Sequence, residues 1–321
     1  MDTIIGEDIR DAIKFLKLGE VIGIPTETVY GLAGNACNIS AVKKIYSAKN
    51  RPNTNPLILH FASVQQIQPF VEDFPENLLK LTQKFWPGPL TILLRKSNLV
   101  PNEITANQEL VAVRIPNHVL LLSILSQLDF PLAAPSANTY GMVSPTSAKH
   151  VMQDLKGKIP FILDGGTCKN GLESTIIGLQ EQKVVVYRLG GISLEELETE
   201  LGYVPTIIKN INKKPLTSGM DEHHYAPKTP LHFYEKKLVN EATQNTGFIF
   251  FQEEHQEISD KNKIILSKSG SLNEAASKLY ASLIEMDTRN FNAIYVERLP
   301  DEGLGKTMND RLNRATLKFR K

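Results

Sequence analysis

Cysteine is scarce in this chain: its 321 residues include only Cys37 and Cys168. The two lie far apart in the sequence and outside any metal-ligand spacing, so we expect two reduced thiols rather than a disulfide or a zinc site. Long hydrophobic runs are also missing, and no apolar stretch is long enough to span a bilayer. The N-terminus lacks the basic start of a signal or transit peptide. We therefore expect a cytoplasmic protein without a membrane partner.

Neither sign of charge dominates the chain. Lys and Arg number 36 against 35 for Asp and Glu, which gives a formal net charge of +1. A protein that binds RNA tightly on its own is usually more basic, because contacts with phosphates supply much of its affinity. The balance therefore argues against autonomous nucleic-acid binding. The length of the chain favours two domains.

Several common nucleotide-binding and catalytic signatures are absent. The sequence contains no G-x-x-x-x-G-K-[ST] phosphate loop and no G-x-G-x-x-G after a strand. It also lacks the G-x-S-x-G nucleophile elbow and the zinc motif H-E-x-x-H. A nucleotide would therefore have to bind through side chains at strand ends, with Mg²⁺ held mainly by its phosphates and by water.

What the sequence does contain is an alternation of helical and extended patterns. Helices are expected at residues 9–16, 40–49, 76–86, 118–128 and 193–202, where apolar residues recur at helical spacing. In the last of these segments Ser193 and Glu196 also form a capping box. Short apolar runs typical of strands occupy residues 21–25, 57–61, 90–94, 110–115, 132–134 and 161–163, and a hairpin is expected at 175–189. This mixture favours an α/β fold with a partly antiparallel, twisted sheet.

The pattern stops and then restarts in the last third of the chain. Residues 209–230 are rich in Lys, Pro, Ser, Gly and His and have no periodicity, which is typical of a linker. Beyond it, strands are expected at 248–251, 264–266 and 293–296, with a helix between the last two. We therefore divide the chain into a first domain at 1–205, a linker at 206–230 and a smaller α/β domain at 231–321.

Three polar motifs stand in apolar surroundings: Pro25 to Leu32, Lys49-Asn50-Arg51-Pro52 and Pro135-Ser136-Ala137-Asn138. Together they outline a polar pocket at the ends of buried strands. Lys and Arg suit phosphate or carboxylate oxygens, so the pocket favours a small anionic ligand and above all a nucleotide. The alternatives are a solvated helix end for the cations and a helix cap or Asx-turn for Ser136 and Asn138.

Two arginines, Arg114 and Arg188, end strands that should be buried. A buried charge needs an anionic partner, because burial without one is very costly. For Arg114 that partner is a structural carboxylate such as Glu27 or a substrate carboxylate, and we favour the substrate. His60, inside an apolar strand, is by itself more typical of a structural histidine. Ser144 is expected to cap a helix.

These motifs also carry a resemblance to a known family. The matching segments are 25–32, 49–52 with 55–57, 86–91, 113–116, 134–138, 172–175, 218–220, 224–228 and 310–312. The chain resembles the YrdC-like threonylcarbamoyl-AMP synthases, in the long form that carries a second C-terminal domain. The resemblance covers nearly the whole chain. It implies an open, twisted, mixed-sheet YrdC-like domain with a positively charged concave pocket, and a smaller Rossmann-like C-terminal domain.

The same resemblance implies an activity. The family makes threonylcarbamoyl-adenylate from L-threonine, bicarbonate and ATP, with Mg²⁺ bound mainly through the ATP phosphates, and releases pyrophosphate. A downstream threonylcarbamoyl transferase then uses the product to modify adenosine 37 of tRNA, so contact of this chain with tRNA is expected to be weak or indirect. No metal site built from protein side chains is expected.

The resemblance also assigns residues. The threonine-binding positions are Thr28, His60, Arg114 and Ser174, with main-chain help at Ala134. The ATP-binding positions are Arg51, Asn55, Ser136, Asn138, Ser144 and Arg188, with a main-chain contact at Leu110 and a linker contact at Tyr225. Lys49 and Arg51 are the expected catalytic pair, because they would neutralise the triphosphate and the carbamate.

One segment departs from the family's pattern. The family linker usually contains Ser-Pro-Gly-Met before basic and aromatic residues, whereas this chain has Thr217-Ser218-Gly219-Met220 followed by Asp221 and Glu222. The segment is interpreted as a loop that closes over the pocket, with a plain tether as the alternative.

Two other functions are alternatives to the synthase activity. The first is an RNA-binding module for tRNA or rRNA, supported mainly by the terminal cations Arg311, Arg314, Lys318, Arg320 and Lys321, which are more simply explained as an exposed helix end. The second is a carbamoyl-phosphate-using protein of related fold, which would leave the threonine-type positions without a role.

Overall fold

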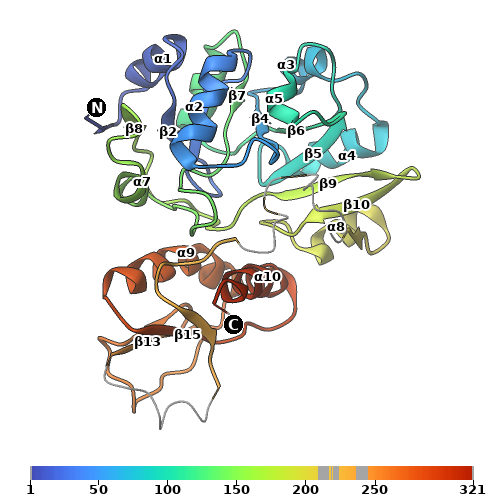
Figure 1. The fold of residues 1–321 in the computed structure, drawn as a ribbon. Helices are drawn as coiled ribbons and strands as arrows, with labels where there is room; N and C mark the ends of the chain where they lie inside the picture. Colours follow the sequence, from blue (N-terminus) through green and yellow to red (C-terminus); the bar gives the residue numbers. More distant parts are fainter. Residues whose placement is uncertain (1, 209–216, 218, 220–223, 236–244, 320–321) are drawn as a thin grey trace.

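The computed structural model describes residues 2–208, 217, 219, 224–235 and 245–319, and two β-sheets organise them (Figure 1). In this described part, the larger sheet has eleven strands from residues 4–207 and the smaller has four from residues 231–296. Helices pack against both sheets. The predicted α/β fold with a large mixed sheet and a smaller C-terminal α/β domain is confirmed.

The larger sheet is built from short strands in the order β1-β8-β2-β3-β7-β4-β6-β5-β9-β10-β11. Their bounds are β1 Ile4–Gly6, β2 Ile22–Ile24, β3 Gly31–Asn35, β4 Ile58–His60, β5 Leu90–Arg95, β6 Leu110–Arg114, β7 Leu132–Ala133, β8 Phe161–Leu163, β9 Thr175–Gln180, β10 Lys183–Arg188 and β11 Thr206–Ile207. Strands β4 and β6 pair in parallel, whereas β5 and β6 are antiparallel. Strands β9 and β10 form the predicted hairpin.

Helices connect these strands. Their bounds are α1 Ile9–Lys17, α2 Ile39–Lys49, α3 Val64–Ile67, α4 Glu76–Phe85, α5 Asn102–Thr105, α6 Val119–Ser126, α7 Ala148–Leu155 and α8 Leu194–Leu201, with a 3₁₀ turn η1 at Gln68–Phe70. The capping box predicted for α8 is present, since Ser193 and Glu196 each bond the other's backbone amide.

The prediction that Ser144 caps a helix is wrong. Helix α7 is capped by Ser147, whose hydroxyl accepts a hydrogen bond from the amide of His150. The hydroxyl of Ser144 instead donates to a carboxylate oxygen of Glu173, at 2.7 Å. A contact with a distant residue has therefore replaced the local one that the sequence suggested.

The smaller sheet is parallel throughout its described strands. It consists of β12 Leu231–Phe233, β13 Thr246–Phe250, β14 Lys263–Ile265 and β15 Ala293–Val296 in the order β12-β15-β13-β14. Helices α9, Leu272–Thr288, and α10, Gly303–Leu317, lie on the side of this sheet that faces the larger domain (Figure 1). The sequence pattern predicted α9 and missed β12, and of α10 it predicted only an exposed helix end near the terminal cations.

The segment predicted as a linker is described only in part. Its first residues form β11, which pairs in parallel with β10. The departure at Ser218, Met220 and the two acidic residues lies outside the described residues. Among the described helices, none combines the length and the apolar character needed to cross a membrane.

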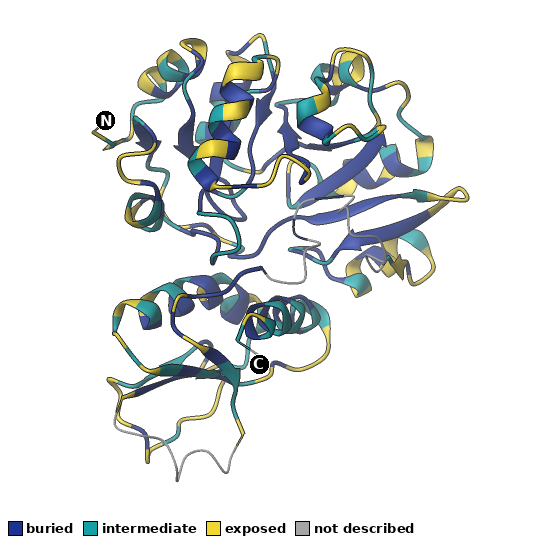
Figure 2. Ribbon diagram, viewed as in Figure 1, coloured by how far each residue is buried: buried dark blue, intermediate teal, exposed yellow. Residues whose placement is uncertain are grey.

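Burial follows the layers, with the inner strands of the larger sheet buried and the outer helix faces exposed (Figure 2). One cation departs from the expectation for the C-terminal end of the chain. Arg311 was expected on an exposed helix end, yet only 1% of it is exposed. Arg314 is partly buried and Lys318 exposed, while Arg320 and Lys321 lie outside the described residues. The prediction of a uniformly exposed basic end is wrong because Arg311 faces the larger domain.

The two domains approach each other closely at Gly171. This residue has φ +72°, and a Cβ built on it would lie 2.4 Å from the carbonyl oxygen of Ala276 in α9. Nearby, the hydroxyl of Thr307 in α10 donates to the carbonyl of Gly190 at 3.1 Å. A side chain at position 171 would therefore push α9 away from the larger domain.

We predict that Gly171→Ala lowers the free energy of unfolding more than Gly166→Ala does. Gly166 also has a positive φ, +81°, but a Cβ there would meet nothing within 4 Å. Its substitution costs about 1–2 kcal/mol for the left-handed backbone, whereas Gly171→Ala adds about 1–3 kcal/mol of overpacking. Denaturant unfolding of both variants measures the difference, and equal losses would contradict the close domain contact.

Candidate active site

A small buried cavity lies between the ends of several strands of the larger sheet and the segment that enters the smaller domain. Its volume is about 40 Å³. It brings together eight of the predicted site residues, namely Thr28, His60, Arg114, Ala134, Ser136, Ser174, Arg188 and Tyr225. We call this space the central cavity. Residues from seven separate stretches of sequence therefore meet where the resemblance expects one pocket.

One wall of the central cavity is formed by β4, β6 and the polar turn after β2. The parallel register places His60 opposite Arg114. The guanidinium of Arg114 donates to Glu27 at 2.6 Å and to the hydroxyl of Thr28 at 3.0 Å. Of the two partners that the sequence left open for Arg114, the structural carboxylate is present in this structure. A planar guanidinium held in this way is well placed to receive a further carboxylate.

His60 is a neutral imidazole at physiological pH. Burial, helped by the nearby charge of Arg114, lowers the pKa of His60 from 6.5 to about 3. One of its ring nitrogens, Nδ1, lies 3.3 Å from the carbonyl oxygen of Ile58. His60 can therefore position a polar ligand by hydrogen bonding but cannot supply a positive charge.

A second cluster lies beside the central cavity and contains Lys49, Arg51, Asn55 and Asn138. Lys49, the last residue of α2, is only 1% exposed and donates to the carbonyl oxygens of Ser136 and Asn138 at 2.5 Å. Arg51 donates to the side-chain and main-chain oxygens of Asn55. The alternative of a solvated helix end is thus wrong for both cations. These four residues do not line the cavity, but the carbonyl of Ser136 links them to it.

The opposite wall is formed by the start of β9 and the end of β10. Arg188 donates to the main-chain oxygen of Ser174 at 2.8 Å and to its hydroxyl at 3.0 Å. The hydroxyl of Ser174 also bonds that of Thr91 at 2.7 Å. Residue 173, immediately before Ser174, is a buried glutamate that lines the cavity, and it accepts the hydrogen bond from Ser144. Ser144 therefore reaches the cavity only through Glu173.

The segment entering the smaller domain contributes His224 and Tyr225, and both lie in the cavity. Tyr225 has φ +67°, a left-handed conformation that is rare for a large side chain. The two rings lie 4.0 Å apart between centroids. Because their side chains occupy the space, a nucleotide can enter only if they move, since a ligand of that size needs several hundred Å³.

Four cations act on the ring of His224. Burial is the main cause that holds the pKa of His224 well below its usual value, and the charges of Arg51, Lys49, Arg311 and Arg188 all act in the same direction. Cations of the second cluster, of the central cavity and of the smaller domain therefore all disfavour a protonated His224. Such a concentration of buried positive charge is typical of a site for a polyanion.

Several buried polar atoms around the cavity have no hydrogen-bond partner among the described residues. They are Oε2 of Glu27, Oδ1 of Asn138, Nδ1 of His224 and the hydroxyl of Tyr225. Each such atom costs about 1–3 kcal/mol when it stays unsatisfied. Two of these atoms, on His224 and Tyr225, belong to residues that line the cavity, where a ligand would supply the missing partners.

Leu110 is the predicted site residue that the structure places elsewhere. It lies at the far end of β6 and lines a separate hollow of about 270 Å³ with Leu93 and Tyr187. The sequence did not predict Glu173 and His224 as site residues, although both lie in segments that carry the family resemblance. A charged residue between the apolar Leu172 and the strand at 175 was the available signal for Glu173.

The described residues offer no ready metal site. No group of three or more His, Cys, Asp or Glu side chains is arranged to hold an ion within them. Both carboxylate oxygens of Glu173 are engaged, one by Ser144 and the other by Tyr280 and Arg311. The side chains present therefore do not fit a metal held by the protein itself.

Comparison with known proteins agrees with this geometry. Residues 14–190 match the Sua5/YciO/YrdC family model, described as "Telomere recombination", and residues 192–316 match "Threonylcarbamoyl-AMP synthase, C-terminal domain". The Threonylcarbamoyl-AMP synthase of Pyrococcus abyssi is 37% identical, over 96% of this chain and 94% of that protein. The chain belongs to the threonylcarbamoyl-AMP synthase family.

Further relatives of this family support the same conclusion. The Bacillus subtilis Threonylcarbamoyl-AMP synthase is 38% identical, over 96% of this chain and 92% of that protein. The crystal structure of P. abyssi Sua5 complexed with L-threonine is similar with a TM-score of 0.89 and 35% identity, over 98% of both chains. The predicted family, fold and enzyme class are thereby confirmed, while the roles of individual site residues stay predictions.

The pKa of His60 predicts a pH dependence of stability. Between pH 6.5 and about 3 the unfolded chain binds a proton at this histidine and the folded protein does not. The free energy of unfolding therefore falls as the pH is lowered through this range, with a contribution from His60 of up to about 1.4 kcal/mol per pH unit.

Denaturant unfolding of wild type and His60→Gln between pH 8 and pH 4 tests this. The stability advantage of the wild type over the variant should shrink on acidification and stay constant above pH 7. Two curves that run parallel over the whole range would show that His60 is not held neutral by the fold.

Proposed function

We propose that this chain makes threonylcarbamoyl-AMP from L-threonine, bicarbonate and ATP, with release of pyrophosphate. The proposal is supported by family membership and by the names of relatives that match nearly the whole chain. The observation that carries it is the placing of Arg114 and Arg188 in one cavity, with the buried cations of the second cluster beside it and Lys49 bonded to Ser136 of its lining. A triphosphate and a carboxylate are the ligands that such a site suits.

The chemistry needs little from the protein beyond positioning and charge neutralisation. The neutral amine of threonine attacks the carbon of bicarbonate, and loss of water gives a carbamate. A carbamate oxygen then attacks the α-phosphorus of ATP, and the bond to the β-phosphate oxygen breaks to release pyrophosphate. Both reactants are anionic, so bringing them together requires cations that are fixed in advance.

The side chains of the cavity would divide this work. Arg114 would bind the carboxylate of threonine, with Thr28, His60 and Ser174 around its polar groups and the main chain of Ala134 beside it. Lys49 and Arg51 would neutralise the phosphates and the carbamate. Burial, with the nearby charge of Arg51, lowers the pKa of Lys49 well below its usual value, and a polyphosphate close by would raise it again.

The nucleotide would occupy the space now filled by His224 and Tyr225, near Arg188, Ser136 and Ser144. Asn55 and Asn138 would complete its polar surroundings from the second cluster. The contact proposed at Leu110 would require the nucleotide to extend across the sheet to a separate hollow. Because no group of three or more His, Cys, Asp or Glu side chains in the described residues is arranged to hold an ion, Mg²⁺ would enter with the ATP phosphates.

The same proposal includes three further points. A downstream threonylcarbamoyl transferase that acts on tRNA uses the product, contact of this chain with tRNA is weak or indirect, and the protein is cytoplasmic. They remain predictions. A mixed carbamic–phosphoric anhydride is labile, so a partner that consumes it promptly is expected on chemical grounds.

The proposal predicts pyrophosphate release that depends on L-threonine and that Arg114→Ala abolishes or lowers by about a hundredfold or more. Removal of Arg114 takes away the proposed charge-assisted contact with the threonine carboxylate and leaves Glu27 buried without its cation. The measurement is pyrophosphate release from ATP with bicarbonate, with and without L-threonine.

Arg10→Ala is the matched control, because Arg10 is an exposed arginine on α1 that pairs with Asp8 and does not line the cavity. It should release pyrophosphate at the wild-type rate. Release that does not depend on threonine would point to another acceptor or to a hydrolase. No release, combined with tRNA binding that weakens with salt, would favour the RNA-binding module instead.

A further inference from the structure

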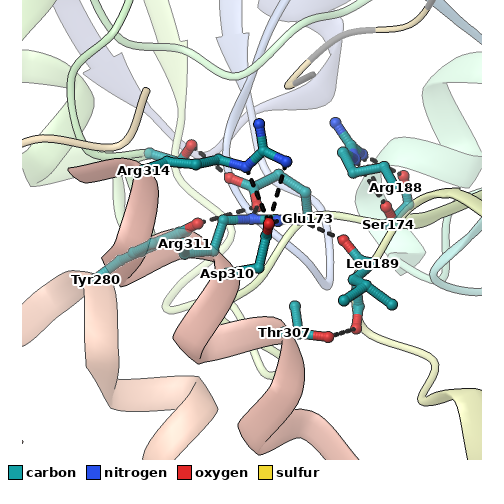
Figure 3. A network of polar contacts seen from close by, with 11 residues as sticks. Glu173, Ser174, Arg188, Leu189, Tyr280, Thr307, Asp310, Arg311 and Arg314 are labelled. Carbon is teal, nitrogen blue, oxygen red and sulfur yellow. Dashed lines mark hydrogen bonds and ion pairs between the residues drawn. The ribbon is translucent and has the colours of Figure 1, made fainter. Parts of the chain in front are cut away.

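Arg311 is a buried arginine that belongs to the smaller domain but is bonded to the larger one. It lies on α10 and is among the largest fully buried side chains in the described residues. Its Nε donates to Oε2 of Glu173 at 3.0 Å, and its Nη2 donates to the main-chain oxygen of Leu189 (Figure 3). A charge that is fully buried at a domain boundary is costly unless every contact is well made.

The carboxylate of Glu173 is shared between the domains. Oε1 accepts from Ser144 at 2.7 Å, within the larger domain. Oε2 accepts from Arg311 and from the hydroxyl of Tyr280 on α9, both at 3.0 Å (Figure 3). Burial disfavours the ionised form, but Arg311, Arg188 and Ser144 outweigh it and keep the pKa of Glu173 below its usual value. Glu173 is thus an ionised group fixed from both sides.

The same arginine also holds the aromatic residue that fills the cavity. The guanidinium carbon of Arg311 lies 4.8 Å from the centre of the Tyr225 ring. The ring of Tyr280 stacks on that of Tyr225, with centroids 6.0 Å apart and an angle of 12°. The left-handed backbone of Tyr225 is maintained only if such contacts hold it.

The two hydrogen bonds of Arg311 to the larger domain reach residues that stand next to Ser174 and Arg188 of the cavity. Glu173 precedes Ser174, and Leu189 follows Arg188. Ser174 and Arg188 are bonded to each other, so Arg311 fixes both ends of that pair through their neighbours. Arg311 itself does not line the cavity. Its influence on a ligand would pass through Glu173, Leu189 and Tyr225.

We propose that Arg311 is a positioning residue for the nucleotide, and that Tyr280 assists it. The smaller domain thereby completes the active site, because Arg311, with Tyr280, sets the place of Ser144 through Glu173, that of Arg188 through Leu189 and that of Tyr225 by direct ring contact. This inference rests on the proposed function for its kinetic consequences. Its structural part, the fixing of residue 225 and the chain beside it, can be measured without any turnover.

Kinetics of Arg311→Met and Tyr280→Phe test the proposal. We expect kcat/KM for ATP to fall about tenfold or more in Arg311→Met and severalfold in Tyr280→Phe. The KM for ATP should rise more than that for L-threonine, since Ser144 and Arg188 are nucleotide positions. Arg311→Lys should rescue little, because an ammonium cannot make the two bonds and cover the ring together.

Lys306→Met is the matched control. Lys306 lies on the same helix and also pairs across the domain boundary, with Glu195 at 2.7 Å, but at a solvent-accessible place. It should keep the wild-type kinetic constants. If Arg311→Met does not fold, Tyr280→Phe decides, because it removes one hydroxyl with almost no change of volume. Folded variants with wild-type constants and only a lower melting temperature would overturn the proposal.

Hydrogen–deuterium exchange of the ligand-free protein separates this inference from the proposed function. The amide of Ala226, next to Tyr225, donates to the carbonyl of Gly141 at 3.0 Å and should be protected. Exchange at residues 224–227 should be faster in Arg311→Met and Tyr280→Phe, and unchanged in Lys306→Met. Unchanged exchange in all variants would contradict the inference even if the wild type is an active synthase. If the wild type has no synthase activity but exchange is still faster in Arg311→Met and Tyr280→Phe, the proposed function fails and this inference is supported.

Discussion

The cost of burying charge is the constraint on which the arrangement of this molecule depends. Arg114, Arg188 and Arg311 are nearly inaccessible to solvent, and so is Lys49. Such groups are tolerated only where oxygens surround them, and breaking one buried pair typically costs about 3–5 kcal/mol. The carboxylates of Glu27 and Glu173 meet this need on opposite walls of the central cavity. Sheet order, turn geometry and domain contact all serve to bring these groups together.

The domain boundary is therefore part of the site rather than a tether. The larger domain supplies the strand ends, and the smaller one supplies α9 and α10, which face it (Figure 1). Gly171 allows the backbones to approach, and Glu173 accepts bonds from both sides. The segment that joins the domains places Tyr225 between these helices and the cavity. Movement of that segment would open the space that a nucleotide needs.

The sequence predicted the local structure well where the signals were local. Apolar periodicity, the hairpin and the capping box at Ser193 all appear in the fold. It failed where a distant contact competed with a local one. Ser144 resembles a helix cap, but its partner is Glu173, and Arg311 resembles a solvated cation, but its partner lies 138 positions away. Neither pairing leaves a trace in spacing or composition, so only the three-dimensional structure shows it.

The most direct measurement of the central claim is the identification of the product itself. The protein would be incubated with ATP, L-threonine and bicarbonate labelled with carbon-13, and the nucleotides analysed by mass spectrometry. The account predicts an adenylate that contains threonine and carries the carbon-13 label. An unlabelled AMP or ADP as the sole nucleotide product would contradict it, because the cavity would then not be joining threonine, bicarbonate and the α-phosphate.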